Sequence, residues 1–334
     1  MNAIVYYDYG SPDVLRLEQR ERPLPGDHQV LLKVRAASAN PLDWHYTRGT
    51  PYILRMIGAG LRRPKVAHLG VDVAGQVAAV GRNVTRFKSG DEVFGAGDGS
   101  FAEYALASED KLALKPARLT FEQAAAVTVA AVSALQALRD KGRIQPGQKV
   151  LINGASGGVG TFAVQIAKSF GADVTGVCST RNVDMVRSIG ADHVIDYTKE
   201  DPTRSAQRYD LILDNVGNHS LSAYRRVMSP KGTYVLVGGG GPDDGRWIGP
   251  LGLPLKALMW SPFVSQKFVL LLASINKDDL GVLKTLLEAN TLTPVIDKTY
   301  TLREVPAAVR YLEQGHARGK VVITVDRTER LTLQ

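Results

Sequence analysis

The chain has 334 residues, one cysteine and a formal net charge of +8, with 44% hydrophobic and 22% charged residues. This length predicts two domains, and the composition is typical of a globular protein with a large core. A single cysteine excludes an internal disulfide framework and a cysteine-cluster metal site. The basic residues are scattered, without a charged run interleaved with aromatics, so we expect no nucleic-acid partner.

The N-terminal segment MNAIVYYDYGSPDVL has neither a charged n-region nor an apolar core. We therefore expect a first strand there instead of a targeting segment, and a cytoplasmic location. The most apolar stretch, from Ile248 to Ile275, is interrupted by Lys256 and Lys267 and holds several prolines. It predicts no membrane span.

The first third of the chain, up to about Lys115, consists of short apolar runs broken by Gly, Pro and Asp turns. This pattern predicts a mostly β unit. The predicted strands are 30–35, 75–81, 92–95 and 101–105.

Thr120 is predicted to begin a helix, because Gln123 stands where it completes a capping box. The alanine-rich run from Ala124 to Leu138 follows and continues the helical pattern.

From Lys149 onward, strands and helices alternate, which predicts a parallel sheet covered by helices on both faces. The predicted strands are 150–152, 173–177, 193–195, 211–214, 234–237, 294–300 and 320–325. One helix is predicted to begin near Val159. The other predicted helices are 182–189, 221–227, 277–289 and 304–312.

The most informative segment is GQKVLINGASGGVGTFAVQIAK, from Gly147 to Lys168. It reads as an apolar strand, a turn with Gly154, Gly157 and Gly160, and an amphipathic helix. Such a turn lets the backbone approach a pyrophosphate at the N-terminus of a helix. A glycine triplet also occurs in ordinary tight turns. With further βα units behind it, the segment predicts a nicotinamide-dependent enzyme.

The choice of cofactor is predicted from the end of the second strand of this unit. NAD enzymes place an acidic residue there for the ribose 2′-hydroxyl, whereas the run from Val177 to Asn182 holds none. Ser179, Thr180 and Arg181 would suit a 2′-phosphate, so we expect NADPH. Alternatively, Ser179 and Thr180 only cap the following helix. Cys178 beside them is expected to be a small apolar strand-end residue.

Asn215 and Gly217 close one predicted strand, and Gly238 closes another. Strand ends at the switch point of such a sheet are where the nicotinamide ribose should lie. The same residues can also be read as plain turn residues.

With these blocks in view, the chain resembles the medium-chain dehydrogenase/reductase superfamily, on its zinc-free, zeta-crystallin-like quinone oxidoreductase branch. The matching segments are the glycine turn, Asn40–Trp44, Gly70–Gly75, Gly90–Val93 and His316–Lys320. The resemblance implies an α/β protein in which a Rossmann doubly wound parallel sheet is inserted in a GroES-like, mostly-β catalytic domain. The implied domains are 1–122 and 277–334 (catalytic) around 123–276 (NADPH-binding), in a homodimer or homotetramer.

The same resemblance implies that no metal is bound. Asn40 stands where zinc-dependent relatives have their first cysteine ligand, and Val71-Asp72 replaces their His-Glu pair. The short run from Gly95 to Ser100 leaves no room for a cysteine-rich structural lobe.

The resemblance also implies which further residues bind the cofactor. Besides Ser179, Thr180, Arg181, Asn215, Gly217 and Gly238, they are Asn40, Ser133, Ser156, Gly157, Gly158, Val159, Tyr197, His316, Ala317 and Arg318. Ser133 and Asn40 would lie toward the nicotinamide, Tyr197 toward the 2′-phosphate and adenine, and residues 316–318 would close over the cofactor.

Hydride transfer from NADPH to a quinone or an α,β-unsaturated carbonyl is the expected reaction, because these acceptors need no Lewis acid. Tyr46 is the candidate donor to the developing oxyanion, with Asp43 and His45 as possible members of a proton relay. An ordinary packing tyrosine, with protons supplied by solvent, fits equally well.

Two other functions, and the role of one region, stay open on the sequence alone. The chain could be a zinc-free alcohol or aldehyde oxidoreductase, or a cofactor-regulated, RNA-binding or structural, zeta-crystallin-like protein. The region 238–275, with Trp247, Trp260 and Phe263, could be core, a wall for a small hydrophobic substrate, or a subunit contact.

Overall fold

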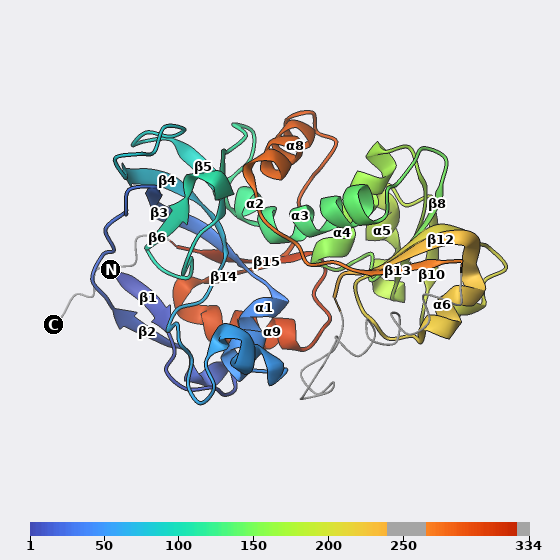
Figure 1. The fold of residues 1–334 in the computed structure, drawn as a ribbon, viewed down its shortest axis with the longest axis horizontal. Helices are drawn as coiled ribbons and strands as arrows, with labels where there is room; N and C mark the ends of the chain where they lie inside the picture. The colour runs from blue at the N-terminus through green and yellow to red at the C-terminus, as the bar shows by residue number, and fades with distance from the viewer. Residues whose placement is uncertain (239–264, 326–334) are drawn as a thin grey trace.

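Two sheets form the framework of the computed structural model, which describes residues 1–238 and 265–325 (Figure 1). One sheet is parallel, with the strand order β10-β9-β8-β11-β12-β13. Its strands are β8 Lys149–Asn153, β9 Asp173–Cys178, β10 His193–Asp196, β11 Tyr209–Asp214, β12 Met228–Leu236 and β13 Lys267–Leu270. The chain moves outward from β8 in one direction and then from β11 in the other. This reversal makes the carboxyl ends of β8 and β11 the switch point, where such sheets bind ligands.

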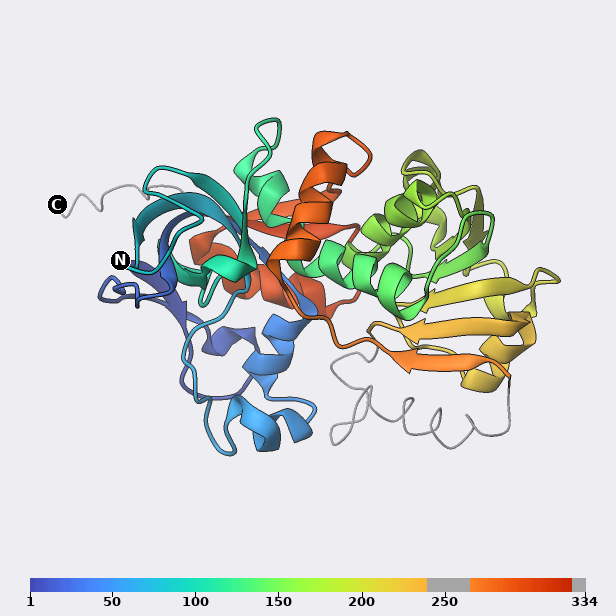
Figure 2. The same ribbon diagram turned by 45° about the horizontal axis from the view of Figure 1, so that its top comes forward.

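Helices cover both faces of the parallel sheet, as predicted (Figure 2). Val150 and Ile152 on β8 face a core that includes Phe162 of α4, whereas Leu151 between them faces Tyr224 of α6. The period-2 alternation of β8 therefore supplies two separate cores, one on each side. The helices are α4 Gly158–Ser169, α5 Val183–Ser188 and α6 Leu221–Val227.

The other sheet joins the two ends of the chain. Its path is β14-β15-β3-β4-β5-β7, with β6 also paired to β3. The strands are β3 Gln29–Ala39, β4 Asp72–Val80, β5 Glu92–Ala96, β6 Tyr104–Ser108, β7 Leu112–Leu114, β14 Ile296–Thr301 and β15 Lys320–Thr324; a small ribbon of β1 Asn2–Val5 and β2 Arg16–Gln19 lies beside them. Because β15 pairs with β3, segments at opposite ends of the chain form one unit, as the resemblance implied. The exact domain boundaries at 122/123 and 276/277 stay predictions.

Several elements differ from the sequence-based prediction. Helix α1, Pro41–Arg48, lies within the segment predicted as mostly β, and its signal was the capping box of Asn40 and Asp43. The sequence analysis does not predict strands β2, β7 and β13. Strand β6, Tyr104–Ser108, begins three residues later than expected.

The alanine-rich run is two helices, α2 Phe121–Ala125 and α3 Thr128–Gln136, and not one. The capping box of Thr120 and Gln123 forms as predicted. The second helix starts where the Asp72 carboxylate accepts a hydrogen bond from the Val129 N–H at 2.8 Å, which stabilises a new helix N-terminus.

Helices α2 and α3 lie between the two sheets and pack closely against both lobes (Figure 1). Their alanines are almost fully buried in a core that also holds Ala36 and Phe94 of one lobe and Val150 and Leu213 of the other. Small side chains permit this close approach. The lobes therefore share one continuous core. The C-terminal helices α8 Lys277–Glu288 and α9 Val305–Glu313 complete the described fold.

A buried ion pair connects the C-terminal strand to the sheet beside it. The Lys320 ammonium donates to the Asp72 carboxylate at 3.0 Å and to the Asn40 side-chain oxygen at 2.7 Å. The exposed fractions are 3% for Lys320 and 0% for Asp72. Asp72 also accepts from the Ser38 hydroxyl at 2.6 Å and the Asn40 amide at 3.0 Å. Buried charges of this kind are stable only while every partner is present.

We predict that Lys320→Met destabilises the protein by about 3–5 kcal/mol, because it leaves the Asp72 charge buried without its cation. Chemical denaturation followed by circular dichroism measures the change. Adding Asp72→Asn should recover a large part of the loss, since the amide carries no charge. Lys284→Met, at the exposed pair with Glu288, is the matched control and should cost less than about 1 kcal/mol. Equal losses at the two lysines would contradict the assignment.

Candidate functional site

The glycine turn between β8 and α4 has the geometry of a dinucleotide site. Gly154 has a φ of +75°, which the tight turn requires. A Cβ on Gly160 would lie 2.0 Å from the Gly154 carbonyl oxygen, so this glycine is needed for close helix–strand packing. A Cβ on Gly157 would meet nothing closer than 3.5 Å, which leaves its backbone open to a ligand. These are the three roles of the glycines in a pyrophosphate-binding turn, and the residues present fit such a group.

The C-terminal segment covers the turn from the other lobe. The Gly319 N–H donates to the Ser156 carbonyl at 2.8 Å, and Gly157 and Gly319 form an isolated parallel bridge. A Cβ on Gly158 would lie 3.3 Å from Lys320 Cδ, which shows how closely the buried lysine approaches the turn. The two lobes therefore meet at the predicted pyrophosphate site.

The other predicted residues of this C-terminal segment lie nearby. The Arg181 guanidinium donates to the His316 carbonyl at 2.7 Å, and the Arg318 N–H donates to Asp297 at 2.9 Å. Ala317 packs partly buried against the core of the catalytic lobe. Arg181 is exposed, and among the described residues its guanidinium donates only to His316, so its remaining N–H groups can bind an anion.

At the end of β9, Asn182 connects two predicted cofactor residues. Its side-chain amide donates to the Ser156 hydroxyl at 3.0 Å and to the Ser179 hydroxyl at 3.2 Å. The glycine turn and the predicted 2′-phosphate site are thereby held together by one buried side chain.

Because the run 177–182 holds no acid, the sequence predicts no carboxylate in reach of this end. That prediction is wrong, since the fold brings Asp196 to it. The Thr180 hydroxyl donates to the Asp196 carboxylate at 2.6 Å, across from the neighbouring strand β10. This bond and others from Thr198 and Lys199 lower the pKa of Asp196 to about 2 despite its burial. The single hydroxyl proton of Thr180 is thus donated to Asp196. The Asp196 carboxylate also accepts from Thr198 and pairs with Lys199. The run 177–182 could not reveal this carboxylate, because Asp196 belongs to β10, a later strand that pairs with β9.

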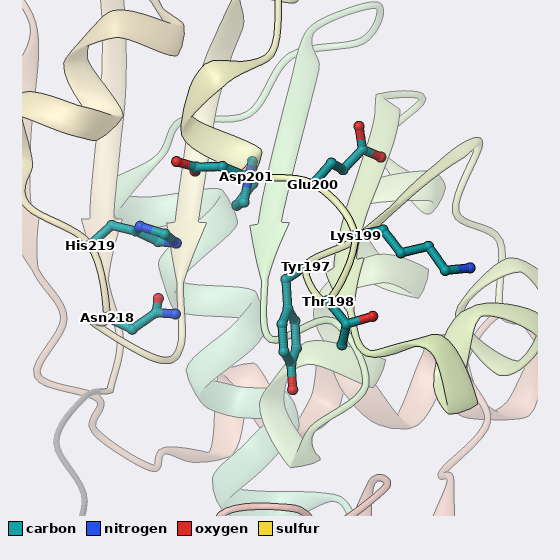
Figure 3. A pocket seen from close by; sticks show the side chains of 8 residues that line it. Tyr197, Thr198, Lys199, Glu200, Asp201, Asn218 and His219 are labelled. Carbon is teal, nitrogen blue, oxygen red and sulfur yellow. The ribbon is translucent and has the colours of Figure 1, made fainter.

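A cavity of about 330 Å³ lies next to this end, lined by residues 197–202, Asn218 and His219 (Figure 3). Tyr197, 51% exposed, lines it from the loop after β10, and Asn218 and His219 line it from the loop after β11. These loops flank the carboxyl ends of the parallel strands. The cavity lies where the resemblance places the adenine.

At the switch point, a buried Asp214 fixes the loop after β11. Its carboxylate accepts from the Val216 and Gly217 N–H groups at 3.0 and 2.9 Å, from the Asn153 amide at 2.8 Å and from the Tyr234 hydroxyl at 2.7 Å. The Asn215 amide donates to the Asn153 carbonyl at 2.9 Å, and its buried oxygen has no partner among the described residues.

Gly238 lies beside this loop, since a Cβ on it would be 3.2 Å from the Asn215 carbonyl oxygen. The structure therefore brings Asn215, Gly217 and Gly238 together. The neighbouring residues 239–264, with Trp247, Trp260 and Phe263, lie outside the described part of the chain.

Asn40 and Ser133 lie on opposite sides of the Asp72 cluster. Asn40 caps α1 and contacts Lys320, whereas the Ser133 hydroxyl donates to the Val129 carbonyl at 2.7 Å within α3, whose first turn is capped by Asp72. Asn40 and Asp72, which the resemblance aligns with metal ligands of zinc-dependent relatives, are thus paired with each other and with Lys320. Within the described ranges, no group of three or more His, Cys, Asp or Glu side chains could hold a metal ion.

Helix α1 presents the three residues proposed for proton transfer. Burial raises the pKa of Asp43 to about 7, and its carboxylate already accepts from the Asn40 and Gly70 N–H groups. His45 lies with Nδ1 2.7 Å from the Thr50 carbonyl, and burial lowers its pKa. Nδ1 must therefore donate, which leaves Nε2 of the neutral ring an acceptor. Tyr46 is half-buried and packs at the edge of the catalytic-lobe core.

Cys178 is buried at the end of β9, and burial raises the pKa of its thiol to about 11. It is an unreactive thiol at neutral pH, in agreement with the apolar role expected for it. No helix among the described residues is long and apolar enough to cross a membrane.

Comparison with known protein families gives two matches, one in the N-terminal third of the chain and one in its second half. Residues 26–117 match the family model described as an alcohol dehydrogenase GroES-like domain, and residues 189–323 match one described as a zinc-binding dehydrogenase. A mitochondrial NAD(P)H oxidoreductase of Mus musculus, RTN4IP1, is 36% identical, over 97% of this chain and 89% of its own length. The 2-methylene-furan-3-one reductase of Solanum lycopersicum is also 36% identical, over 97% and 79%.

Among solved structures, the quinone oxidoreductase of Coxiella burnetii superposes with a TM-score of 0.84 at 30% identity, covering 98% of this chain and 99% of that one. The chain belongs to the medium-chain dehydrogenase/reductase superfamily, on its zinc-free quinone oxidoreductase branch. It is a nicotinamide-dependent oxidoreductase, and the α/β fold expected from the sequence is confirmed.

We predict that Gly157→Val and Gly160→Ala separate cofactor binding from folding. Gly157→Val places a branched side chain where the pyrophosphate must approach, so nicotinamide cofactor affinity should fall strongly while the unfolding midpoint stays near that of the wild type. Gly160→Ala forces its Cβ against backbone and should cost about 1–3 kcal/mol of stability. Thermal unfolding and isothermal titration measure both effects, and unchanged affinity in Gly157→Val would remove the turn from the site.

Proposed function

We propose that the protein is an NADPH-dependent reductase of quinones and α,β-unsaturated carbonyl compounds, working without a metal ion. The observation that carries the proposal is the glycine turn covered by the C-terminal strand, with the paired Asn40, Asp72 and Lys320 where a metal would otherwise sit. The Solanum lycopersicum relative is named for reduction of an enone, and the Coxiella burnetii structure is a quinone oxidoreductase. Both acceptors carry their own electron demand and need no Lewis acid.

NADPH is the proposed cofactor because the end of β9 offers donors and no free carboxylate. Arg181 contacts the C-terminal segment, the Ser179 hydroxyl accepts from Asn182, and Tyr197 lines the adjacent cavity. Asp196, the nearby acid, is engaged by Thr180, Thr198 and Lys199 and is 8% exposed. It is therefore poorly placed to bind a ribose 2′-hydroxyl, the interaction that favours NADH.

The residues proposed to bind the cofactor divide along its length. Ser156 to Val159 hold the pyrophosphate, Ser179, Thr180, Arg181 and Tyr197 surround the adenosine end, and Asn215, Gly217, Gly238, Asn40 and Ser133 surround the nicotinamide end. Thr180 acts as an acceptor or a spacer, since its proton is donated to Asp196. When bound, the reduced nicotinamide supplies the hydride.

Tyr46 is the proposed donor to the oxygen that gains charge during the reaction. Neutral His45 cannot donate from Nε2. Asp43 is 3% exposed, and each of its oxygens accepts a backbone N–H group, so Tyr46 is the best-placed donor of the three. His45 could still orient a water molecule as an acceptor. The protein's contribution is otherwise to hold the two reactants and to exclude water.

The resemblance further implies a homodimer or homotetramer, which we propose for this chain. The Mus musculus relative is named as mitochondrial, so the cytoplasmic location expected from the sequence stays a prediction.

We predict turnover of NADPH with 1,4-benzoquinone and with a simple enone, and little turnover with primary alcohols or aldehydes. Because Asn40 and Asp72 are paired with Lys320, and the described residues contain no group of side chains that could hold a metal ion, a strong chelator should leave the rate unchanged. Absorbance at 340 nm across this acceptor panel measures the outcome. Preferred turnover of alcohols, or a loss on chelation that zinc alone restores, would overturn the proposal. RNA retention on a filter tests the binding-protein alternative with the same sample.

We predict that Tyr46→Phe lowers kcat with the enone by about a hundredfold, since loss of one oxyanion donor typically costs this much. The KM for NADPH should change little, because the hydroxyl serves the reacting oxygen. Tyr7→Phe, at an exposed tyrosine bonded to Glu18, is the control and should match the wild type. An unaltered kcat in Tyr46→Phe would assign proton delivery to solvent.

A further inference from the structure

Asn182 is a buried polar residue that the sequence analysis does not include among the predicted cofactor-binding residues. Its side chain is 4% exposed, between β9 and α5, and its amide nitrogen donates to two serine hydroxyls. Its side-chain oxygen is buried without a hydrogen-bond partner among the described residues. A buried acceptor left unpaired costs stability, so its retention points to a role.

The two bonds determine what the serines can offer to a ligand. A serine hydroxyl has one proton and two acceptor sites. Ser156 and Ser179 each use an acceptor site for the Asn182 amide, and the described residues provide no acceptor for either hydroxyl proton. Both protons are therefore available to an anion.

The two serines belong to different parts of the cofactor site. Ser156 lies in the glycine turn, where the pyrophosphate approaches, and Ser179 lies at the end of β9, where the 2′-phosphate would lie. The Asn182 amide thus orients one hydroxyl donor at each of the two predicted phosphate positions.

We propose that Asn182 is the positioning residue that sets the preference for a 2′-phosphorylated cofactor, by directing the Ser179 and Ser156 hydroxyl protons outward. This inference rests on the proposed use of NADPH. An aspartate has nearly the same shape but only accepts hydrogen bonds. It would draw both hydroxyl protons inward and place a negative charge beside the 2′-phosphate.

Binding of cofactor fragments tests this without any catalytic readout. The probes are 2′,5′-ADP and 5′-AMP, which differ only in the 2′-phosphate, titrated calorimetrically into wild type, Asn182→Asp and Ser188→Asp. Ser188 is exposed on the same helix α5, so its substitution adds equal charge without touching the serines. The wild type and the control should prefer 2′,5′-ADP, and Asn182→Asp should reduce that preference by about tenfold or more.

A second variant keeps the test valid if Asn182→Asp fails to fold. Ser179→Ala leaves Asn182 in place and should weaken 2′,5′-ADP by about tenfold while leaving 5′-AMP unchanged. A preference retained in Asn182→Asp, or a Ser179→Ala variant that binds both fragments like the wild type, overturns the inference alone. A wild type without any preference overturns the NADPH proposal and this inference together. Absent quinone and enone turnover with the fragment preferences as expected overturns only the proposed reaction.

Discussion

The buried pair of Lys320 and Asp72 is the constraint on which the arrangement of both lobes depends. Asp72 is the first residue of β4, whose first four residues are buried. Its carboxylate accepts from the first turn of α3, the helix that leads into the nucleotide lobe, and from Lys320 of the C-terminal strand. Each of these contacts is made to a different segment of the chain. Since the charges are sealed from water, the segments must meet with all their donors in place, and this fixes the C-terminal strand against the glycine turn.

The substitution of metal ligands therefore has a structural meaning as well as a chemical one. In this chain, Asn40 and Asp72 both accept hydrogen bonds from Lys320, and Asn40 also donates to Asp72. The site keeps a cation, but as an immobile ammonium that serves the architecture. The acceptors in the proposed reaction are already electrophilic and need no metal cation, and the binding energy of the long cofactor can orient the two reactants.

Much of the fold could be read from the sequence, because its signals are local. Strand β8, the glycine turn and α4 follow from a hydrophobic run, three glycines and an amphipathic period, and the capping box at Thr120 needs four residues. The break between α2 and α3 could not be read, because its cause, Asp72, lies 57 residues away. The same holds at the site. The glycines and Ser179 lie in two short local runs of sequence. The roles of Asp196, Lys320 and Asn182, by contrast, depend on contacts between segments that are distant in the sequence.

The pairing of β15 with β3 has a consequence for how the molecule is made. Val321 lies opposite Ala39 in that ladder, so the sheet closes only after nearly the whole chain has been synthesised. Pairing across such a sequence separation is slow, because the loop-closure entropy is lost before the contacts compensate for it. The parallel sheet from β8 to β12, by contrast, is built from neighbouring units and can form while the chain is still emerging. Because Gly319, next to β15, donates to Ser156 in the glycine turn, this contact between the lobes is completed only when the C-terminal strand joins the sheet.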